Sequence, residues 1–370
     1  MNANNQQVTK RIVSIDALRG FDMFWITGGD SIFPALFALL GTPFFLALSN
    51  QLEHSEWNGF TFYDLIFPLF MFIMGTAMPF SLSKRLQRGD PKGQLYKHII
   101  TRSLSLLILG LLYNGLLDFK FDSFRYAGVL QRFAICYFFA ALIVMNSNKP
   151  RTQAMWAAGL LVFYQLIMAF IPVPGHGMGV LTPEGNLASY IDRLLLPGRF
   201  CCFKYGDNEG ILSSLPAIST VLLGVLSGHL LRSSLSHGKK AVYMVSAGVG
   251  CLVAALIWNF IFPINKLLWS SSYVLYAGGW SLLLLSLFFW LIDIRGYHKW
   301  AFPFVVIGMN PITIYVTQAL FDFGSIAGIF VHGFIDHMGD FRRLFWALCV
   351  FAVKWLFLLF LYKRKIFLKV

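Results

Sequence analysis

Long runs of apolar residues recur along the whole chain, separated by short polar stretches. A helix needs about 20 such residues to cross a bilayer, and we find about ten runs of that kind, at about 13–30, 60–83, 98–117, 126–146, 153–172, 210–232, 241–262, 273–292, 302–321 and 343–362. The short alternating segments typical of a membrane β-barrel are absent from the sequence. The pattern predicts an all-α polytopic membrane helical bundle that forms a single domain over residues 1–370.

Three longer connections should lie together outside the membrane, at about 31–59, 173–209 and 322–342. Residues 31–49 are apolar enough to form an eleventh span. Pro34 and the break Gly41-Thr42-Pro43 instead favour short helices at the outer interface. The apolar piece "GSIAGIFVHGF" is too short to span, so we expect it to lie on the outer leaflet or dip into it.

Composition and charge agree with a membrane protein and set its orientation. Hydrophobic residues make up 57% of the chain and charged residues 13%, whereas soluble domains are about 45–50% apolar. The net charge of +13 could suggest a nucleic-acid partner, but Lys and Arg in membrane proteins gather in cytoplasmic loops. Most of them fall on one predicted side here, including Lys10, Arg11 and the cluster Lys84, Arg85, Arg88, Lys92, Lys97 and Arg102. Both termini are therefore predicted to be cytoplasmic, with no nucleic-acid partner.

The cysteines and histidines show no metal-binding pattern. Cys136, Cys251 and Cys349 fall in predicted spans, and Cys201 and Cys202 are adjacent in an outer loop. None has metal-ligand spacing, so we expect buried thiols. The histidines form no HExxH motif, so we expect no metal and no zinc hydrolase.

The segment "HSEWNGFTFYDLIFPLFMFIMG", residues 54–75, places polar chemistry against a membrane span. The six-cation loop after residue 83 fixes the end of this span to the cytoplasm, so His54 should face outside. An imidazole can act as a general base or a nucleophile near neutral pH, and a carboxylate can orient it. Asp64, one turn inside the helix, and Asp30, at the outer end of the first span, are the two candidates for that carboxylate.

Further polar residues lie within spans or near their ends. Placing an ionisable side chain inside a membrane helix costs free energy, about 2.5–3.5 kcal/mol at the helix centre, so each such residue marks a candidate site. Asp16 and Arg19 are one turn apart and should form an ion pair near the cytoplasmic end. Gln131 and Asn310 can simply hydrogen-bond neighbouring helices. The other marks are Arg132 in "GVLQR" and the acids Asp207 and Glu209 in "GDNEG".

Five sequence blocks, in order, carry a resemblance to a known family: "SIDALRGFDMFWI", the segment 54–75, "RYAGVLQRFAICY", "DNEGILSSLPAISTVLLGVLSG" and "GMNPITIYV". On these blocks the chain resembles the transmembrane glucosamine N-acetyltransferases, which include lysosomal heparan-alpha-glucosaminide N-acetyltransferase and bacterial relatives. The lysosomal enzyme also has an N-terminal luminal domain, so the resemblance covers the catalytic core alone. A small amino sugar or a cell-wall fragment is then a more plausible acceptor than a polymer.

The resemblance implies an acetyltransferase that takes acetyl from cytosolic acetyl-CoA, its co-substrate, and passes it to an amino sugar on the far side. The essential outward-facing histidine of the family corresponds to His54, followed by Trp57 and Asn58. The lysosomal enzyme has a functional asparagine where this chain has Asp30, which leaves the role of Asp30 open. The resemblance also implies a bacterial cytoplasmic (inner) membrane location, with His54 facing the periplasm.

From this mechanism we expect three groups of site residues. The catalytic group is His54 with Asp64 or Asp30, and Asn58 or Asn310 as the donor to the thioester oxyanion. The residues expected to bind acetyl-CoA are Arg19, Arg102, Gln131, Arg132 and Asn310. The guanidinium groups of the three arginines would contact its phosphates. The acceptor group is Trp57, Asp207 and Glu209.

Two other functions fit a multi-span protein with an outer polar site. A transporter or permease for a small polar solute would line its path with these residues, on paired discontinuous helices. An envelope polysaccharide O-acyltransferase would acetylate a hydroxyl by similar chemistry. We expect a homodimer, which no pattern in the sequence specifies.

Overall fold

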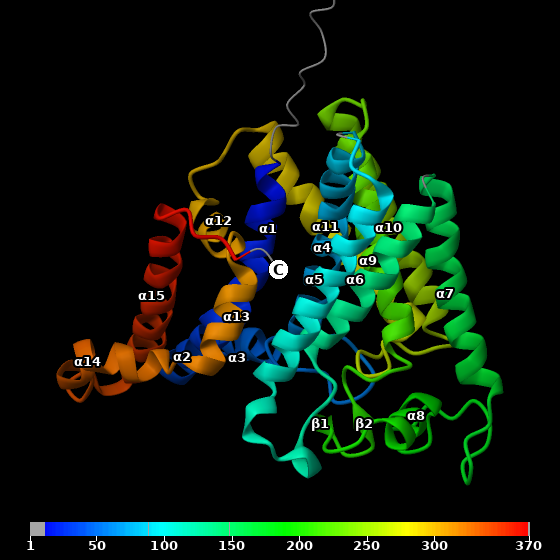
Figure 1. The fold of residues 1–370 in the computed structure, drawn as a ribbon. Helices are drawn as coiled ribbons and strands as arrows, with labels where there is room; N and C mark the ends of the chain where they lie inside the picture. Colours follow the sequence, from blue (N-terminus) through cyan, green and yellow to red (C-terminus); the bar gives the residue numbers. More distant parts are fainter. Residues whose placement is uncertain (1–11, 88, 148, 369–370) are drawn as a thin grey trace, which may run out of the picture.

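The computed structural model describes residues 12–87, 89–147 and 149–368, and it is built almost wholly of helices (Figure 1). Lys10, Arg11 and Arg88, which entered the prediction of orientation, lie outside the described residues. Backbone polar groups in lipid can be satisfied within a helix, so each apolar run folds as one. The long helices are α1 (Val13–Phe24), α2 (Asp30–Leu40), α4 (Tyr63–Gln87), α5 (Lys92–Tyr113), α6 (Val129–Asn146), α7 (Pro150–Phe170), α9 (Ser214–Arg232), α10 (His237–Trp258), α11 (Ser271–Phe288) and α15 (Arg342–Lys363).

The predicted bundle of about ten spans is confirmed. Within the described residues, nine helices are long and apolar enough to cross a membrane, with α1 and α2 counted as one. A tenth, predicted as the continuous span 302–321, is broken: α12 (Phe302–Gly308) and α13 (Pro311–Leu320) meet at a bend of 69°. The break falls at Asn310, because the residue before a proline avoids helical geometry. Other boundaries differ from the prediction by a few residues.

Residues 31–49 do not form a span of their own. A π-helical turn, Trp25–Gly29, joins α1 to α2, and Gly28 within it leaves helical geometry. Gly41 ends α2 in the left-handed conformation, and its N–H bonds to the Phe37 carbonyl at 2.8 Å. Pro43 then begins the short helix α3 (Pro43–Asn50). The break at 41–43 therefore acts as predicted.

The other two long connections carry short elements at the same end of the bundle, the lower end in Figure 1. One holds α8 (Leu187–Leu195) and a hairpin of β1 (Cys202–Phe203) and β2 (Gly206–Asp207). The other holds α14 (Phe323–Ile335), which is apolar but too short to span and lies across the bundle axis. The expectation of free thiols is wrong for Cys201 and Cys202, which form a disulfide with each other.

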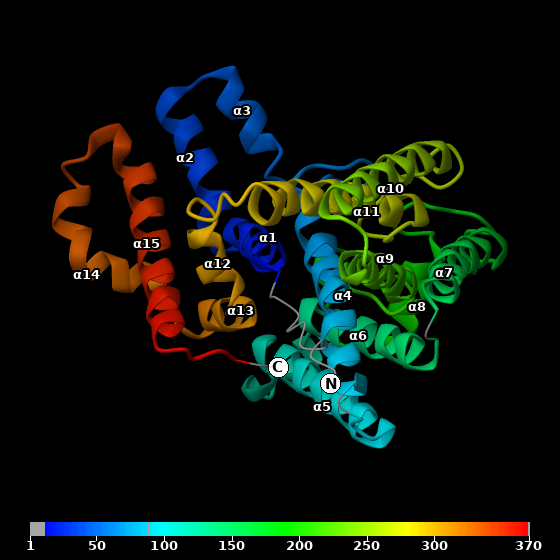
Figure 2. The same ribbon diagram turned by 90° about the horizontal axis from the view of Figure 1, so that it is seen from above.

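The helices fall into two groups (Figures 1 and 2). One contains α4 to α7 and α9 to α11, and the other contains α1, α12, α13 and α15. Glycine brings backbones close together within each group: a Cβ at Gly224 of α9 would lie 2.0 Å from the Phe72 carbonyl oxygen of α4, and a Cβ at Gly308 of α12 would lie 2.0 Å from that of Asp16 in α1. Small residues allow such approach in membranes. The space between the two groups holds the cavities described next.

Candidate active site

A cavity of about 260 Å³ lies between α1 and α13 on one side and α4 and α6 on the other. Its apolar walls include Met23, Phe67, Phe70 and Phe133. Its polar lining gathers at one end, from the loop before α4, the segment after β2 and the connection between α10 and α11. We call it the His54 cavity. Its polar lining residues are His54, Tyr63, Arg125, Cys202, Asn208, Glu209 and Lys266.

The carboxylate that contacts His54 is Asp64, one of the two candidates from the sequence, the other being Asp30. His54 Nδ1 lies 2.8 Å from Asp64 Oδ1. The other Asp64 oxygen accepts from the hydroxyl of Ser55 at 2.8 Å and from the backbone N–H of Thr61 at 3.1 Å. The Asp64 side chain is fully buried while that of His54 is 49% exposed. A carboxylate satisfied in this way takes the Nδ1 proton as a hydrogen bond and leaves Nε2 as the acceptor nitrogen.

Asp30 contacts His54 only through an intermediate ring. Its carboxylate accepts from the Tyr63 hydroxyl at 3.1 Å, and the Tyr63 ring packs on the imidazole with centroids 4.9 Å apart. Tyr63 lines the cavity, whereas Asp30 lies outside the lining. Asp30 is therefore placed to orient Tyr63.

Lys266 completes the His54 group and was missed by the sequence analysis. Its Nζ lies 2.9 Å from Nδ1 and 3.2 Å from Nε2 of His54, and 3.3 Å from Asp64 Oδ1. Burial lowers the pKa of Lys266, while Asp64 acts in the opposite direction. With Nδ1 donating to Asp64, the Lys266 ammonium donates to Nε2. The cavity therefore presents a base and a hydrogen-bond donor side by side.

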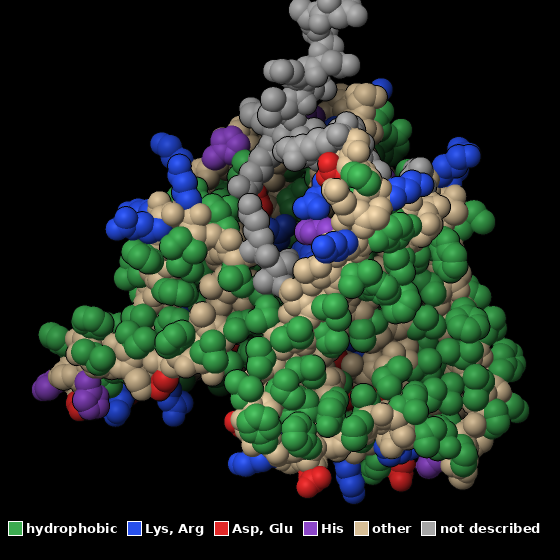
Figure 3. Space-filling view, in the orientation of Figure 1, with side chains coloured by type: hydrophobic (Ala, Val, Ile, Leu, Met, Phe, Trp, Pro, Cys, Tyr) green, Lys and Arg blue, Asp and Glu red, His purple; other side chains and the backbone are tan. Residues whose placement is uncertain are grey.

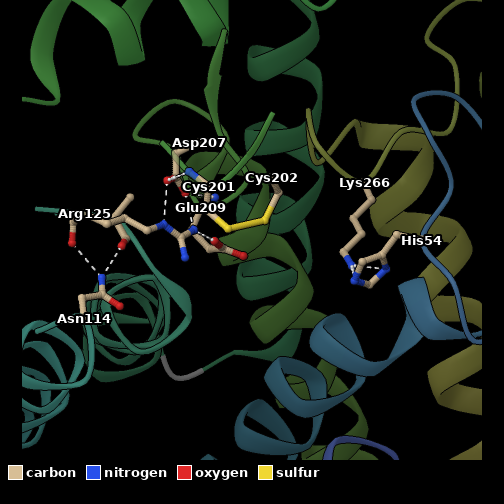
Figure 4. Close-up of a disulfide and its surroundings, with 9 residues drawn as sticks. His54, Asn114, Arg125, Cys201, Cys202, Asp207, Glu209 and Lys266 are labelled. Carbon is tan, nitrogen blue, oxygen red and sulfur yellow. Dashed lines mark hydrogen bonds and ion pairs between the residues drawn. A yellow bond between two sulfur atoms is a disulfide. The ribbon is translucent and has the colours of Figure 1, made fainter. Parts of the chain in front are cut away.

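A cluster of one arginine and two acidic residues faces His54 across the cavity (Figure 4). Arg125 donates to Asp207 through Nε at 2.8 Å and through Nη2 at 2.6 Å, and it also bonds Glu209. Burial raises the pKa of Asp207, but the bonded Arg125 outweighs burial and holds this pKa below its ordinary value. Burial raises the pKa of Glu209 despite the neighbouring guanidinium groups. Glu209 lines the cavity, whereas Asp207 is buried behind it and fixes Arg125.

A second cavity, of about 550 Å³, adjoins the first. The two share Phe70, Phe133, Pro311 and Ile312 as walls. We call the second one the cationic cavity, because its lining includes Arg19, Arg85 and Arg102, with His98 beside them. Figure 3 shows a hollow in the upper half of the molecule with Lys, Arg and His side chains around it. The two cavities therefore adjoin through a common wall, with guanidinium groups in the lining of one and His54 in the lining of the other.

The cations of this second cavity are anchored from both helix groups. Arg19 lies 3.5 Å from Asp16, the predicted ion pair, and also bonds the Gly308 carbonyl at 3.3 Å. Arg102 on α5 lies over the ring of Tyr137, 4.5 Å from its centre.

Arg132 is not at this end of the bundle, contrary to the sequence prediction. It lies in the first turn of α6, is 1% exposed, and bonds Ser213 and the Gly210 carbonyl. Its guanidinium also covers the Trp269 ring at 4.8 Å. Because α6 begins near the His54 cavity, Arg132 is separated from Arg19 and Arg102, and we no longer assign it to phosphate.

Four other residues from the sequence analysis lie behind the cavity walls. Trp57 donates to the Leu181 carbonyl at 3.0 Å, and Asn58 accepts from Asn265 at 3.1 Å. Both contacts fix the loop that carries His54. Gln131 packs at Gly110 and Gly128. Asn310 bonds the backbone of Ile366 at 3.0 Å and of Leu368 at 3.2 Å, at the break in the tenth span.

The fold and these cavities define a class: a multi-pass helical membrane protein with a histidine centre at one end of an internal cavity. Residues 11–259 match the family described as "Heparan-alpha-glucosaminide N-acetyltransferase, catalytic", and the chain belongs to this family. The sequence is 29% identical to heparan-alpha-glucosaminide N-acetyltransferase of Homo sapiens over 327 residues, covering 73% of this chain and 49% of that protein. The Mus musculus protein of the same name is 29% identical over 321 residues, covering 71% and 48%. The chain thus spans about half the length of these curated relatives. The predicted family resemblance is confirmed.

Proposed function

We propose that the protein transfers acetyl from acetyl-CoA to the amine of a small amino sugar at His54. The observation that carries this proposal is the pair of adjoining cavities, with arginines at one end and the His54, Asp64 and Lys266 group at the other. The names of the relatives support the same reaction.

The linings of the two adjoining cavities suit the two ends of acetyl-CoA. Its phosphates suit guanidinium groups, which bind them in a bidentate geometry. Arg19, Arg85 and Arg102 would hold the nucleotide end in the cationic cavity. The rings of Phe70 and Phe133 touch each other in the shared wall, with centroids 5.0 Å apart. The pantetheine arm would have to displace these rings, or pass beside them along Pro311 and Ile312, to bring the thioester to His54.

At the reacting end, each polar group has a task that its geometry allows. The bound acceptor ammonium first loses one proton to water, and the neutral amine then attacks the thioester carbonyl. The new C–N bond forms, and the C–S bond breaks to release the CoA thiolate. His54 Nε2 accepts the amine proton and passes it to that thiolate, while Asp64 keeps Nδ1 protonated. The ammonium of Lys266 shifts from Nε2 to the carbonyl oxygen as negative charge develops there. Attack by Nε2 itself, giving an acetyl-histidine, would use the same contacts.

On the acceptor side, Glu209 and Asn208 are the groups placed to bind an amino sugar. Asn208 Oδ1 is buried and receives no hydrogen bond from the described residues. A sugar hydroxyl or ammonium could donate to it, and Glu209 could balance the ammonium charge. We further propose that this end faces the periplasm of a bacterial inner membrane, in line with the cation-rich loops at the opposite end.

Purified protein with acetyl-CoA and glucosamine tests the reaction directly. We expect equal amounts of free CoA and N-acetylglucosamine, identified by mass spectrometry. Glucose, which offers hydroxyl groups alone, should give no product, and acetylated glucose would instead favour the O-acyltransferase. Solute uptake by vesicles without any acetylated product would favour the transporter. Only one broken span occurs within the described residues, whereas the transporter interpretation expects a pair.

A further inference from the structure

The disulfide between Cys201 and Cys202 lies in the wall of the His54 cavity. Cys202 is a lining residue, together with Asn208 and Glu209. Figure 4 places the disulfide between the group of Arg125 and Glu209 on one side and His54 with Lys266 on the other. Sulfur is polarisable and apolar, so this wall differs from the charged groups on either side of it. The disulfide therefore borders the space left for an acceptor.

The cysteine pair is also connected to the acidic group through the backbone. The Cys201 N–H donates to Asp207 Oδ2 at 3.0 Å, and the Glu209 N–H donates to Asp207 Oδ1 at 2.9 Å. Cys202 pairs with Asp207 across the β1–β2 hairpin. One carboxylate thus holds the disulfide and Glu209 in a fixed relation.

The backbone of Cys202 needs a restraint to stay as it is. Its φ is 75°, in the left-handed region that residues with a side chain rarely adopt. The covalent ring with Cys201 is one restraint on this conformation, and reduction removes it. Loss of the cross-link would therefore move the hairpin and, through Asp207, the Glu209 carboxylate.

We propose that the Cys201–Cys202 disulfide determines acceptor binding: the disulfide form packs against the carbon face of the amino sugar and keeps Glu209 on its ammonium, and the dithiol form binds the sugar weakly. The inference rests on the proposed function for the identity of the acceptor. Acetyl-CoA binding should not depend on the cysteine pair, because the cationic cavity lies at the opposite end. Exchange with dithiothreitol breaks the S–S bond, leaves two thiols on the protein and closes the disulfide of the reagent.

The first measurement is the state of the pair in the purified full-length chain. N-ethylmaleimide applied to unfolded, unreduced protein should modify Cys136, Cys251 and Cys349 and leave the peptide of Cys201 and Cys202 unmodified. Reduction before labelling should add two labels to that peptide. Two labels without reduction would overturn the proposal.

The second measurement compares ligand binding by the two forms. Reduction, or the double variant Cys201→Ser and Cys202→Ser, should raise the KM for glucosamine about tenfold or more and leave the KM for acetyl-CoA unchanged. The Cys251→Ser variant is the matched control and should respond to dithiothreitol like the wild type. An unchanged glucosamine KM after complete reduction would refute this role.

A binding measurement separates this inference from the proposed function. The rise in melting temperature on adding glucosamine needs no turnover, and it should be larger for the disulfide form than for the dithiol form. If neither form transfers acetyl, the proposed reaction fails, and the comparison of melting temperatures still decides whether the disulfide governs sugar binding. Equal shifts in the two forms would contradict it.

Discussion

The His54 ring contacts the carboxylate of Asp64 and the ammonium group of Lys266. Asp64 lies 2.8 Å from Nδ1, and the Lys266 ammonium lies 2.9 Å from Nδ1 and 3.2 Å from Nε2. Such an arrangement keeps the imidazole oriented before any substrate enters, which is what proton transfer in the transition state requires. It also gives each of the three side chains a separate test.

Replacing His54 with alanine should lower acetyl transfer by roughly 10²-fold or more, because the step loses its proton acceptor. Turnover is measured with acetyl-CoA and glucosamine on protein that is monodisperse and melts at the wild-type temperature. His332→Ala, at an exposed histidine of α14, is the control and should leave turnover unchanged. Wild-type turnover in His54→Ala would remove His54 from the mechanism.

Replacing Lys266 with methionine should lower kcat by about 10²–10³-fold with little change in KM, since an oxyanion donor acts on the transition state. The lysine must carry a proton to donate, and burial lowers its pKa from the ordinary 10.5. Wild-type kcat should therefore fall on the alkaline side below pH 10.5. Lys266→Arg keeps its charge, so it should retain part of the activity and move this fall to higher pH. An unmoved alkaline limb would show that another group titrates there.

Sequence reasoning located His54 and Asp64 because they are ten positions apart in one segment. Lys266 is 212 positions from His54, and it stands in a connection with no motif to mark it. Arg132 was misplaced because the residue type fits phosphate, while the direction of α6 puts it at the other end. Only packing reveals such pairings.

At the scale of elements, the α4–α9 crossing holds the site in place. Gly224 of α9 meets the backbone of α4 so closely that a Cβ would lie 2.0 Å from the Phe72 carbonyl oxygen. The first turn of α4 carries Asp64, so movement at the crossing would shift the partner of His54. The runs of apolar residues predict both helices but do not predict the distance between their backbones.

Substituting Gly224 with alanine should therefore destabilise the protein by about 1–3 kcal/mol, the usual cost of overpacking. Melting of the detergent-solubilised protein checks this. Gly159→Ala on α7 is the matched control, because among the described residues no heavy atom beyond the neighbouring residues and backbone of its own helix lies within 4 Å of the added Cβ. It should be neutral or slightly stabilising, since alanine favours a helix over glycine. Equal melting temperatures for the two variants would disprove the tight crossing.

The broken tenth span shows where a pattern of apolar residues stops being informative. "GMNPITIY" contains an Asn-Pro pair that signals a turn, yet the run on both sides is apolar and was predicted as one helix. The bend of 69° between α12 and α13 places Pro311 and Ile312 in the wall shared by both cavities. The number of spans was predictable from length and hydrophobicity, whereas this geometry depends on tertiary contacts.

For the whole molecule, the proposed reaction needs the nucleotide end of acetyl-CoA to bind at the arginines of the cationic cavity. Arg102→Ala should weaken acetyl-CoA binding about tenfold or more, as expected for a lost hydrogen bond to a charged phosphate. Calorimetry measures the Kd. Arg151→Ala, at an exposed cation of α7, removes the same charge elsewhere and should leave affinity unchanged. Equal affinity in Arg102→Ala would place phosphate recognition at another site.

Transfer from one side of the membrane to the other can be measured in sealed vesicles that contain acetyl-CoA, with glucosamine added outside. Neither compound crosses lipid, so only protein molecules with His54 facing outward can react. Protein inserted in the opposite orientation is silent and does not affect the result. We predict that N-acetylglucosamine appears outside while free CoA accumulates inside, and that His54→Ala abolishes both. Product that forms only after the vesicles are opened with detergent, or glucosamine that enters them unacetylated, would contradict transfer through the bundle.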